Sequence, residues 1–210
     1  MDLSPPAEPS PSPVLPTSPL PGVRVVHLDE PWEGTLQRFF EANPAYFEEA
    51  LGEPPAPDAA LLEIRDLPPA DFPYTELFLL GFVQEDGELM AMASVVSDLL
   101  AAGVWHIGLF IVATERHGSG QAAQLHAALQ AWAEHHGARW MRLGVVQGRV
   151  RAERFWVRQG YQQVRLREGV EMGRLTNRLR VMVKPLDGHT VEDYLRRVER
   201  DRPAGRAPAA

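Results

Sequence analysis

Cysteine is absent from the 210-residue sequence. Its absence excludes a disulfide framework, a thiolate zinc site and a cysteine nucleophile. Long apolar runs are missing too, because no stretch approaches the roughly 20 residues that cross a bilayer. The N-terminus lacks the basic and then apolar segment of a secretory signal. We therefore expect a cytoplasmic protein with no membrane partner.

Lysine is almost absent, since Lys184 is the only lysine among the 21 basic residues. With 28 acidic residues the net charge is −7, so we expect no nucleic-acid partner. The charge is uneven: residues 1–136 hold 20 acidic and 4 basic side chains, whereas residues 137–210 hold 8 and 17. Arginine presents a planar fork that suits phosphate oxygens, so the second part is compatible with an anionic ligand. A solvated surface explains the same bias more simply.

Proline and serine dominate the start of the chain, where residues 1–22 contain eight prolines and four serines. Such a segment buries too little apolar surface to offset its ordering entropy, which predicts a flexible, partly polyproline-like tail over residues 1–22. We expect a second flexible tail over residues 201–210. The chain is 45% hydrophobic, which suits one domain with a core over residues 23–200.

Apolar periodicity predicts strands and helices throughout this domain. Strands are predicted at residues 23–28, 77–83, 89–96, 104–112, 140–146, 161–166 and 178–183. Helices are predicted at residues 34–42, 46–51, 58–65, 122–136, 149–159 and 190–200. Asp86-Gly87 favours a hairpin between the second and third strands, and the continuous apolar run of the fourth is typical of a buried central strand. The predicted class is α+β, with one mixed sheet and helices on both faces.

A glycine-containing turn, Gly118-Ser119-Gly120, separates the central strand from the long helix. Free amides and the helix dipole at such a turn can bind a phosphate, although a plain tight turn would explain it about as often. The third glycine of a dinucleotide fingerprint and a following Gly-Lys-Ser/Thr are both missing. His117 and Gln121 stand where a nucleophile elbow has glycines, so Ser119 is not one. The strands on either side of the helix should be parallel, with a right-handed crossover.

The order of these motifs resembles a known family. Residues 105–165, WHIGLFIVATERHGSGQAAQLHAALQAWAEHHGARWMRLGVVQGRVRAERFWVRQGYQQVR, resemble the acetyl-CoA-binding core of GNAT-superfamily N-acetyltransferases. The upstream FFEANPAYFEEALGEPP and the downstream NRLRVMVKPL resemble one bacterial branch, which extends the likeness over residues 23–200. The resemblance implies a GNAT-like acyl-CoA N-acyltransferase fold, with a mostly antiparallel sheet and a splayed parallel pair at residues 105–112 and 140–146.

The resemblance also implies a site for acetyl-CoA in the gap between the splayed strands. The central strand would meet the pantetheine arm, the turn would hold the pyrophosphate, and the 149–159 helix would line the other side. Arginine side chains near the gap, Arg151 and Arg154 among them, would meet CoA phosphates. The implied cofactor-binding residues are Phe110, Ile111, Val112, Arg116, His117, Gly118, Ser119, Gly120, Gln121, Arg149, Ala152 and Phe155.

The sequence departs from the family pattern in three places. Glu115 replaces a basic residue at the start of the turn if the glycines set the register, and Arg149 stands where the family often has asparagine. Trp156 occupies the position of a tyrosine that protonates the departing thiolate in many members. Tyr161 is the nearest substitute, although a tyrosine at a strand start also suits the core. Water is a third source, because a thiol has a pKa of about 8.5.

In this family the resemblance implies direct attack of an amine on the thioester in a ternary complex. A backbone amide near Ile111 would polarise the carbonyl, and a base would take the amine proton. His106 is the only titratable side chain in the central strand, so it is the candidate base, with a core histidine as the alternative. The implied acceptor region contains Glu41, Tyr46, Glu48 and Glu49, which are also explained as a solvated helix surface.

The sequence therefore predicts an acetyl-CoA-dependent N-acetyltransferase acting on a primary amine, which the acidic first part suggests is a small cationic molecule. The alternative is a catalytically degenerate module of the same fold that senses CoA or binds a protein, and an interaction scaffold acting through the proline-rich tail is a third hypothesis. The seven histidines lack the spacing of metal ligands, so we expect no metal. A homodimer is compatible with the sequence.

Overall fold

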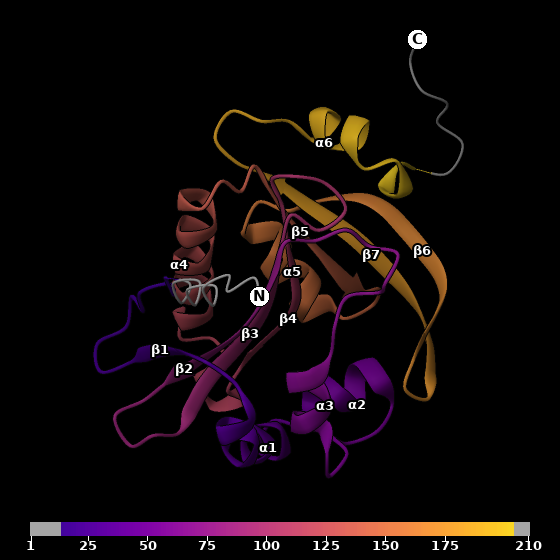
Figure 1. The fold of residues 1–210 in the computed structure, drawn as a ribbon. Helices are drawn as coiled ribbons and strands as arrows, with labels where there is room; N and C mark the ends of the chain where they lie inside the picture. The colour runs from indigo at the N-terminus through magenta and orange to yellow at the C-terminus, as the bar shows by residue number, and fades with distance from the viewer. Residues whose placement is uncertain (1–13, 204–210) are drawn as a thin grey trace, which may run out of the picture.

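The structure is a computed structural model, and it describes residues 14–203 (Figure 1). In this part of the chain seven strands form one sheet in the order β1-β2-β3-β4-β5-β7-β6. All neighbours are antiparallel except β4 and β5, which are parallel. The strands are β1 Arg24–His27, β2 Glu76–Val83, β3 Leu89–Ser97, β4 Val104–Val112, β5 Trp140–Val146, β6 Gln162–Met172 and β7 Leu175–Pro185.

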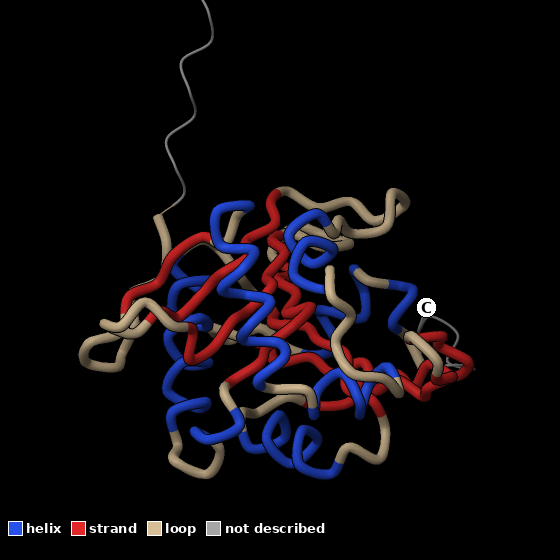
Figure 2. The backbone as a smooth tube through the Cα atoms, turned by 90° about the horizontal axis from the view of Figure 1, so that it is seen from below, coloured by secondary structure: helices blue, strands red, loops and turns tan. Residues whose placement is uncertain are grey.

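Helices cover both faces of the sheet (Figures 1 and 2). The α4 and α5 helices share one hydrophobic core with the sheet, and α1 to α3 share a second core on the opposite face. The α6 helix packs in a third cluster with Trp140 and Val183. Within residues 14–203, none of the helices has the length and apolar character of a membrane span. The helices are α1 Glu33–Ala42, α2 Ala45–Leu51, α3 Ala59–Arg65, α4 Gln121–His135, α5 Val150–Arg158 and α6 Val191–Arg197.

A β-bulge at Gly108 reverses the two faces of β4. Ser94 of β3 pairs with Leu109 and Val95 pairs with Ile107, so Gly108 is an extra residue. Ile107 therefore packs in the α4 core, whereas Leu109, two residues later, packs in the α1 core. A bulge bends and twists its strand, which turns the end of β4 away from β5.

The parallel pair separates immediately before this bulge. Only Val104–Ile107 of β4 pairs with Trp140–Leu143 of β5, although the two strands continue to Val112 and Val146. Beyond that point β5 pairs with β7 alone. The predicted fold class, a mixed sheet with a splayed parallel pair and helices on both faces, is thus confirmed.

The largest difference from the predicted elements is the final hairpin. Strands predicted at residues 161–166 and 178–183 are instead eleven residues each, at Gln162–Met172 and Leu175–Pro185. Since β6 is an edge strand with an exposed outer part, it needs no continuous apolar pattern, and its charged second half gave no strand signal. The predicted final helix is also shorter: α6 ends at Arg197, and a 3-10 turn, Glu199–Asp201, follows.

Each predicted tail lies partly within the described residues, and residues 1–13 and 204–210 lie outside them. The indole Nε1 of Trp132 donates to the Val14 carbonyl at 2.7 Å, and Leu15 and Leu20 pack against the α4 core. The prediction of a flexible segment is therefore wrong for residues 14–22. A few apolar side chains are enough to hold this segment against the surface of α4. At the other end Asp201 is fully buried, which excludes it from a flexible tail.

Candidate functional site

A cavity of about 280 Å³ lies where β4 and β5 separate. Its walls come from β4, β5 and α5, while α2 and the β6–β7 hairpin close it. The fold thus brings together segments that are distant in the sequence. The predicted site residues that line this cavity are Tyr46, Glu49, His106, Phe110, Arg149 and Ala152.

The register of β4 decides which backbone groups face the gap. The Ala113 N–H donates to the Met90 carbonyl at 2.8 Å, and antiparallel pairs alternate, so Ile111 bonds toward β3. Phe110 and Val112 consequently direct their backbone groups into the gap. The predicted cofactor role of Ile111 does not fit this register, because its backbone points away from the gap and its side chain is buried in the α1 core.

The turn before α4 presents open main-chain donors. Gly118 and Gly120 have φ values of +83° and +85°, and no atom lies within 4 Å of where a Cβ would stand on either. Among the hydrogen bonds of residues 14–203, none uses the N–H of Gly118, Gly120 or Ala122. These donors surround the N-terminus of a 15-residue helix. Unpaired amides at a helix N-terminus fit a phosphate group.

The side chains of the turn are engaged within the protein. The Ser119 hydroxyl donates to the Arg116 carbonyl at 2.6 Å and accepts from the Gln121 N–H at 3.3 Å, which closes the turn. His117 Nε2 donates to the Val112 carbonyl at 2.8 Å and ties the turn to β4. The turn therefore offers a ligand its main chain and not these side chains.

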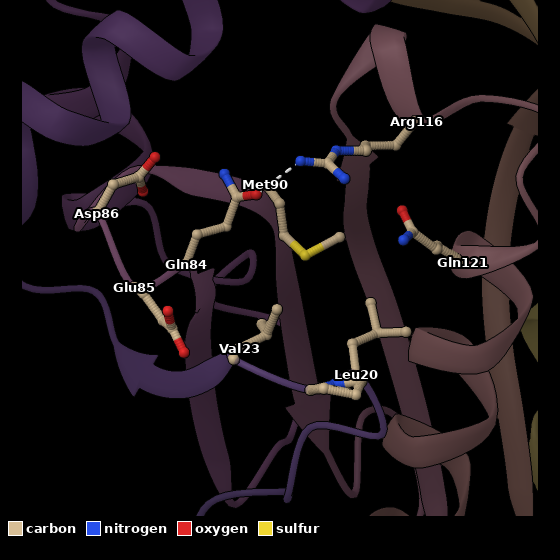
Figure 3. Close-up of a pocket in the computed structure, with 10 residues that line it drawn as sticks. Leu20, Val23, Gln84, Glu85, Asp86, Met90, Arg116 and Gln121 are labelled. Carbon is tan, nitrogen blue, oxygen red and sulfur yellow. Dashed lines mark hydrogen bonds between the residues drawn. The ribbon is translucent and has the colours of Figure 1, made fainter.

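A second cavity of about 520 Å³ lies beside residues 20–23, the β2–β3 hairpin and the turn (Figure 3). The Arg116 and Gln121 side chains line it. Arg116 donates to Gln84 Oε1 at 2.7 Å and pairs with Glu115 at 3.2 Å. The predicted phosphate contact of Arg116 is thus not favoured by its position.

Of the other arginines predicted to meet phosphates, Arg151 carries a charge that acts on the turn. The pKa of His117 is lowered, first by partial burial and also by the Arg151 charge. Arg151 and Arg154 are exposed on α5, and neither forms an ion pair within the described residues. Arg149 instead donates to the Glu49 carbonyl and ties the start of α5 to α2.

His106 faces Arg142 across the paired part of β4 and β5. Its Nδ1 lies 3.1 Å from the Arg142 carbonyl oxygen and 3.2 Å from the guanidinium Nη1. Burial and the Arg142 charge lower the pKa of His106 to about 3. At neutral pH His106 is therefore uncharged and a weak base, which suits hydrogen bonding to a reactant better than storing its proton.

The position of Tyr161 does not favour a proton-donor role. Only 2% of this residue is exposed, its hydroxyl lies 3.0 Å from His126 Nε2, and it lines neither cavity. Burial raises the pKa of its hydroxyl well above the usual range. Gly160 turns the chain so that Tyr161 enters the core under α4. Trp156 lies at the cavity instead, with its ring centroid 5.9 Å from that of Phe110.

The acceptor residues predicted from the sequence separate into two pairs. Tyr46 and Glu49 line the cavity, whereas Glu41 and Glu48 do not, although Glu49 is exposed as they are. Glu63 of α3 was missed: burial and then Asp66 raise its pKa to about 7, and its charge raises the pKa of Tyr46 beyond the effect of burial. The short α3 pattern gave no signal that this half-buried carboxyl acts on Tyr46.

The β6–β7 hairpin supplies an apolar wall that the sequence did not reveal. Met172, Leu179 and Val181 line the cavity. The hairpin is anchored on α2, because the Arg174 N–H donates to the Leu51 carbonyl at 2.7 Å and Asn177 Nδ2 donates to the Ala50 carbonyl at 2.9 Å. Its role went unseen because the outer half of the hairpin was not predicted to be a strand.

The fold, with its splayed parallel pair, is similar to that of solved acetyltransferases. An acetyltransferase from Thermus thermophilus is 21% identical with a TM-score of 0.58, covering 78% of this chain and 97% of its own. A GCN5-related N-acetyltransferase from Kribbella flavida is 19% identical with a TM-score of 0.56, over 79% and 98%. A Salmonella typhimurium protein, determined with its cofactor acetyl-CoA, is 17% identical with a TM-score of 0.55, over 80% and 96%.

The sequence itself assigns the family. The model of the acetyltransferase (GNAT) family matches residues 36–161, which is more than half of the chain. The protein belongs to the GNAT acetyltransferase family and is an acyltransferase. No curated protein matches the sequence significantly.

Proposed function

We propose that this protein transfers the acetyl group of acetyl-CoA to a primary amine of a small cationic molecule, by direct attack in a ternary complex. The observation that carries the proposal is the presence of two features along one strand. The β4 strand borders the cavity where it separates from β5, and the turn that follows the same strand carries the open amides of Gly118 and Gly120. Acetyl-CoA supplies an activated acetyl thioester.

The residues of the gap suit such a molecule along its length. The Gly118, Gly120 and Ala122 amides would bind the pyrophosphate, because they are unpaired donors at a helix N-terminus. The outward backbone groups of Phe110 would bind the pantetheine arm as an added strand would. Phe155, whose ring centroid is 6.3 Å from that of Phe110, would cover the arm from α5.

The acceptor would enter from the α2 side, where Glu49 provides a carboxylate for a cationic amine. His106, neutral at physiological pH, would orient the attacking nitrogen or a water beside it through Nε2. Trp156 carries no acidic proton for the departing thiolate, so solvent would supply it. The attacking amine would lose its proton to solvent through the water beside it, which balances the proton taken up by the thiolate.

Calorimetric titration with acetyl-CoA and free CoA, followed by an amine screen that begins with polyamines, tests the proposal. We expect saturable micromolar binding and turnover with at least one cationic amine. His106→Ala should lower turnover by roughly ten-fold or more and leave the Kd for acetyl-CoA unchanged. If neither acetyl-CoA nor free CoA binds, the proposal is refuted. If His106→Ala has the wild-type rate, His106 has no role in the reaction.

Arg151→Gln should weaken the binding of CoA by roughly five- to thirty-fold, because a charge-assisted hydrogen bond to phosphate contributes about 1–2 kcal/mol at an exposed site. Titration with pantetheine, which carries no phosphate, should give the same Kd for variant and wild type. Arg154→Gln is the matched control on the same helix and should change the CoA affinity less. If both variants lose the same CoA affinity, Arg151 acts through its general positive charge and not through a specific contact with phosphate.

A further inference from the structure

A buried ion pair lies directly behind the cavity and has no part in the proposed function as described so far. Asp201, in the last 3-10 turn, is fully buried and accepts from Arg142 Nε at 2.7 Å and Nη2 at 3.2 Å. The Tyr194 hydroxyl donates to the same carboxylate at 2.6 Å, and Arg167 Nη2 donates at 2.8 Å. Four hydrogen bonds from three side chains therefore hold Asp201 in one position.

This arrangement leaves one end of the Arg142 guanidinium for another partner. Because Asp201 occupies Nε and Nη2, Nη1 is the remaining nitrogen, and it lies 3.2 Å from His106 Nδ1. The Arg142 carbonyl oxygen is 3.1 Å from the same Nδ1. A neutral imidazole carries a single N–H, so Nδ1 either donates to the carbonyl or accepts from Nη1.

In both cases Nδ1 is committed to Arg142 and Nε2 is left for the cavity. Nε2 of His106 forms no hydrogen bond within residues 14–203, and His106 lines the cavity. Through the Nη1 contact, the direction of the imidazole ring depends on where the guanidinium of Arg142 is held. Arg142 itself is only 7% exposed and also lines the cavity, so a change in its position would reach the reacting groups.

We propose that Asp201 is a positioning residue for acetyl transfer, which acts through Arg142 to fix the ring orientation and the tautomer of His106. The proposal rests on the proposed function, in which His106 meets the amine. It makes the C-terminal segment part of the site, although no residue of that segment lines the cavity. Arg142 and its neighbours keep the pKa of Asp201 at about 2, so the carboxylate stays charged at working pH.

Histidine NMR of the full chain gives a readout that needs no activity. In the wild type we expect the Nδ1 and Nε2 signals of His106 to show one tautomer. Asp201→Asn should shift both signals toward a mixture of tautomers, because the amide holds the guanidinium less firmly. Glu199→Gln is the matched control in the same turn, since Glu199 only forms an exposed pair with Arg202, and should leave both signals unchanged. Unchanged His106 signals in folded Asp201→Asn would overturn the proposal.

Kinetics separate positioning from a structural role. With acetyl-CoA and spermidine, Asp201→Asn should lower kcat about ten-fold without changing the Kd for acetyl-CoA. In the His106→Ala background the same substitution should cause no further loss, because the effect passes through that ring. An equal loss in both backgrounds would overturn the proposal. Absence of wild-type turnover would count against the proposed function, and the NMR result would then decide the role of Asp201 alone.

A variant that removes both charges guards against a failure to fold. Arg142→Met combined with Asp201→Asn removes both buried charges of the pair, and such replacements of a buried pair are often tolerated. Arg167, which also pairs with Asp201, is 26% exposed and keeps access to solvent. His106 then loses the Nη1 contact, so its signals should shift in the double variant too. Wild-type signals in that variant would show that the pair does not position His106.

Discussion

Gly118→Val should reduce the affinity for acetyl-CoA and for CoA at least about 100-fold, since two or more amide–phosphate hydrogen bonds of roughly 1.5–3 kcal/mol each would be lost. Gly118 has φ +83°, which a β-branched residue disfavours, so the turn would rearrange. The open space beside its Cα, which a phosphate would need, would also be filled by the new side chain. Calorimetric titration measures both affinities.

Gly137→Val is the matched control at the other end of α4. Gly137 has φ +91°, and no atom lies within 4 Å of its notional Cβ, so the backbone strain is comparable. It lies outside the predicted phosphate site, and we expect a loss of stability with unchanged affinity. Wild-type affinity in Gly118→Val would show that the turn is only structural.

Asp201→Ala should destabilise the protein by about 3–5 kcal/mol at neutral pH, which is the usual cost of removing one partner of a buried ion pair. Arg142 is 7% exposed and would lose its bidentate partner, and Arg167 would face it without the intervening carboxylate. Urea unfolding measures the difference in free energy. Glu199→Ala, which breaks an exposed pair in the same turn, should change it by less than about 1 kcal/mol.

The difference in unfolding free energy between wild type and Asp201→Ala should depend on pH. Burial alone would raise the pKa of Asp201, but hydrogen bonds and charge from Arg142, with Tyr194 and Arg167, lower it from 3.8 to about 2. A carboxyl with a depressed folded-state pKa stabilises the protein above its unfolded pKa and loses that contribution as pH falls through the folded one. The difference between wild type and Asp201→Ala should therefore be full above about pH 4 and shrink steadily toward about pH 2. A difference of constant size would contradict a role of the carboxylate charge.

The sequence by itself determined the part of the fold whose signals are local. A continuous apolar run gave β4, 3.6-residue periodicity gave α4, and an Asp-Gly pair gave the β2–β3 hairpin. Gly118 and Gly120 could be assigned to an open turn because positive φ is a property of the residue type. The resemblance then placed this unit in a family that the family model confirms.

Only the tertiary structure decided which groups face the cavity, because register and long-range pairing leave no trace in local periodicity. The bulge at Gly108 reverses the faces of β4 and turns Ile111 away from the gap, although the strand itself was predicted correctly. Tyr161 follows closely after Trp156, which lines the cavity, yet a turn buries it in the core. Asp201 stands 95 positions after His106, and only the packing of the C-terminal turn against β5 brings Arg142 between them. Such contacts join residues that are distant in the sequence, so they depend on the packing of all the elements and not on any local pattern.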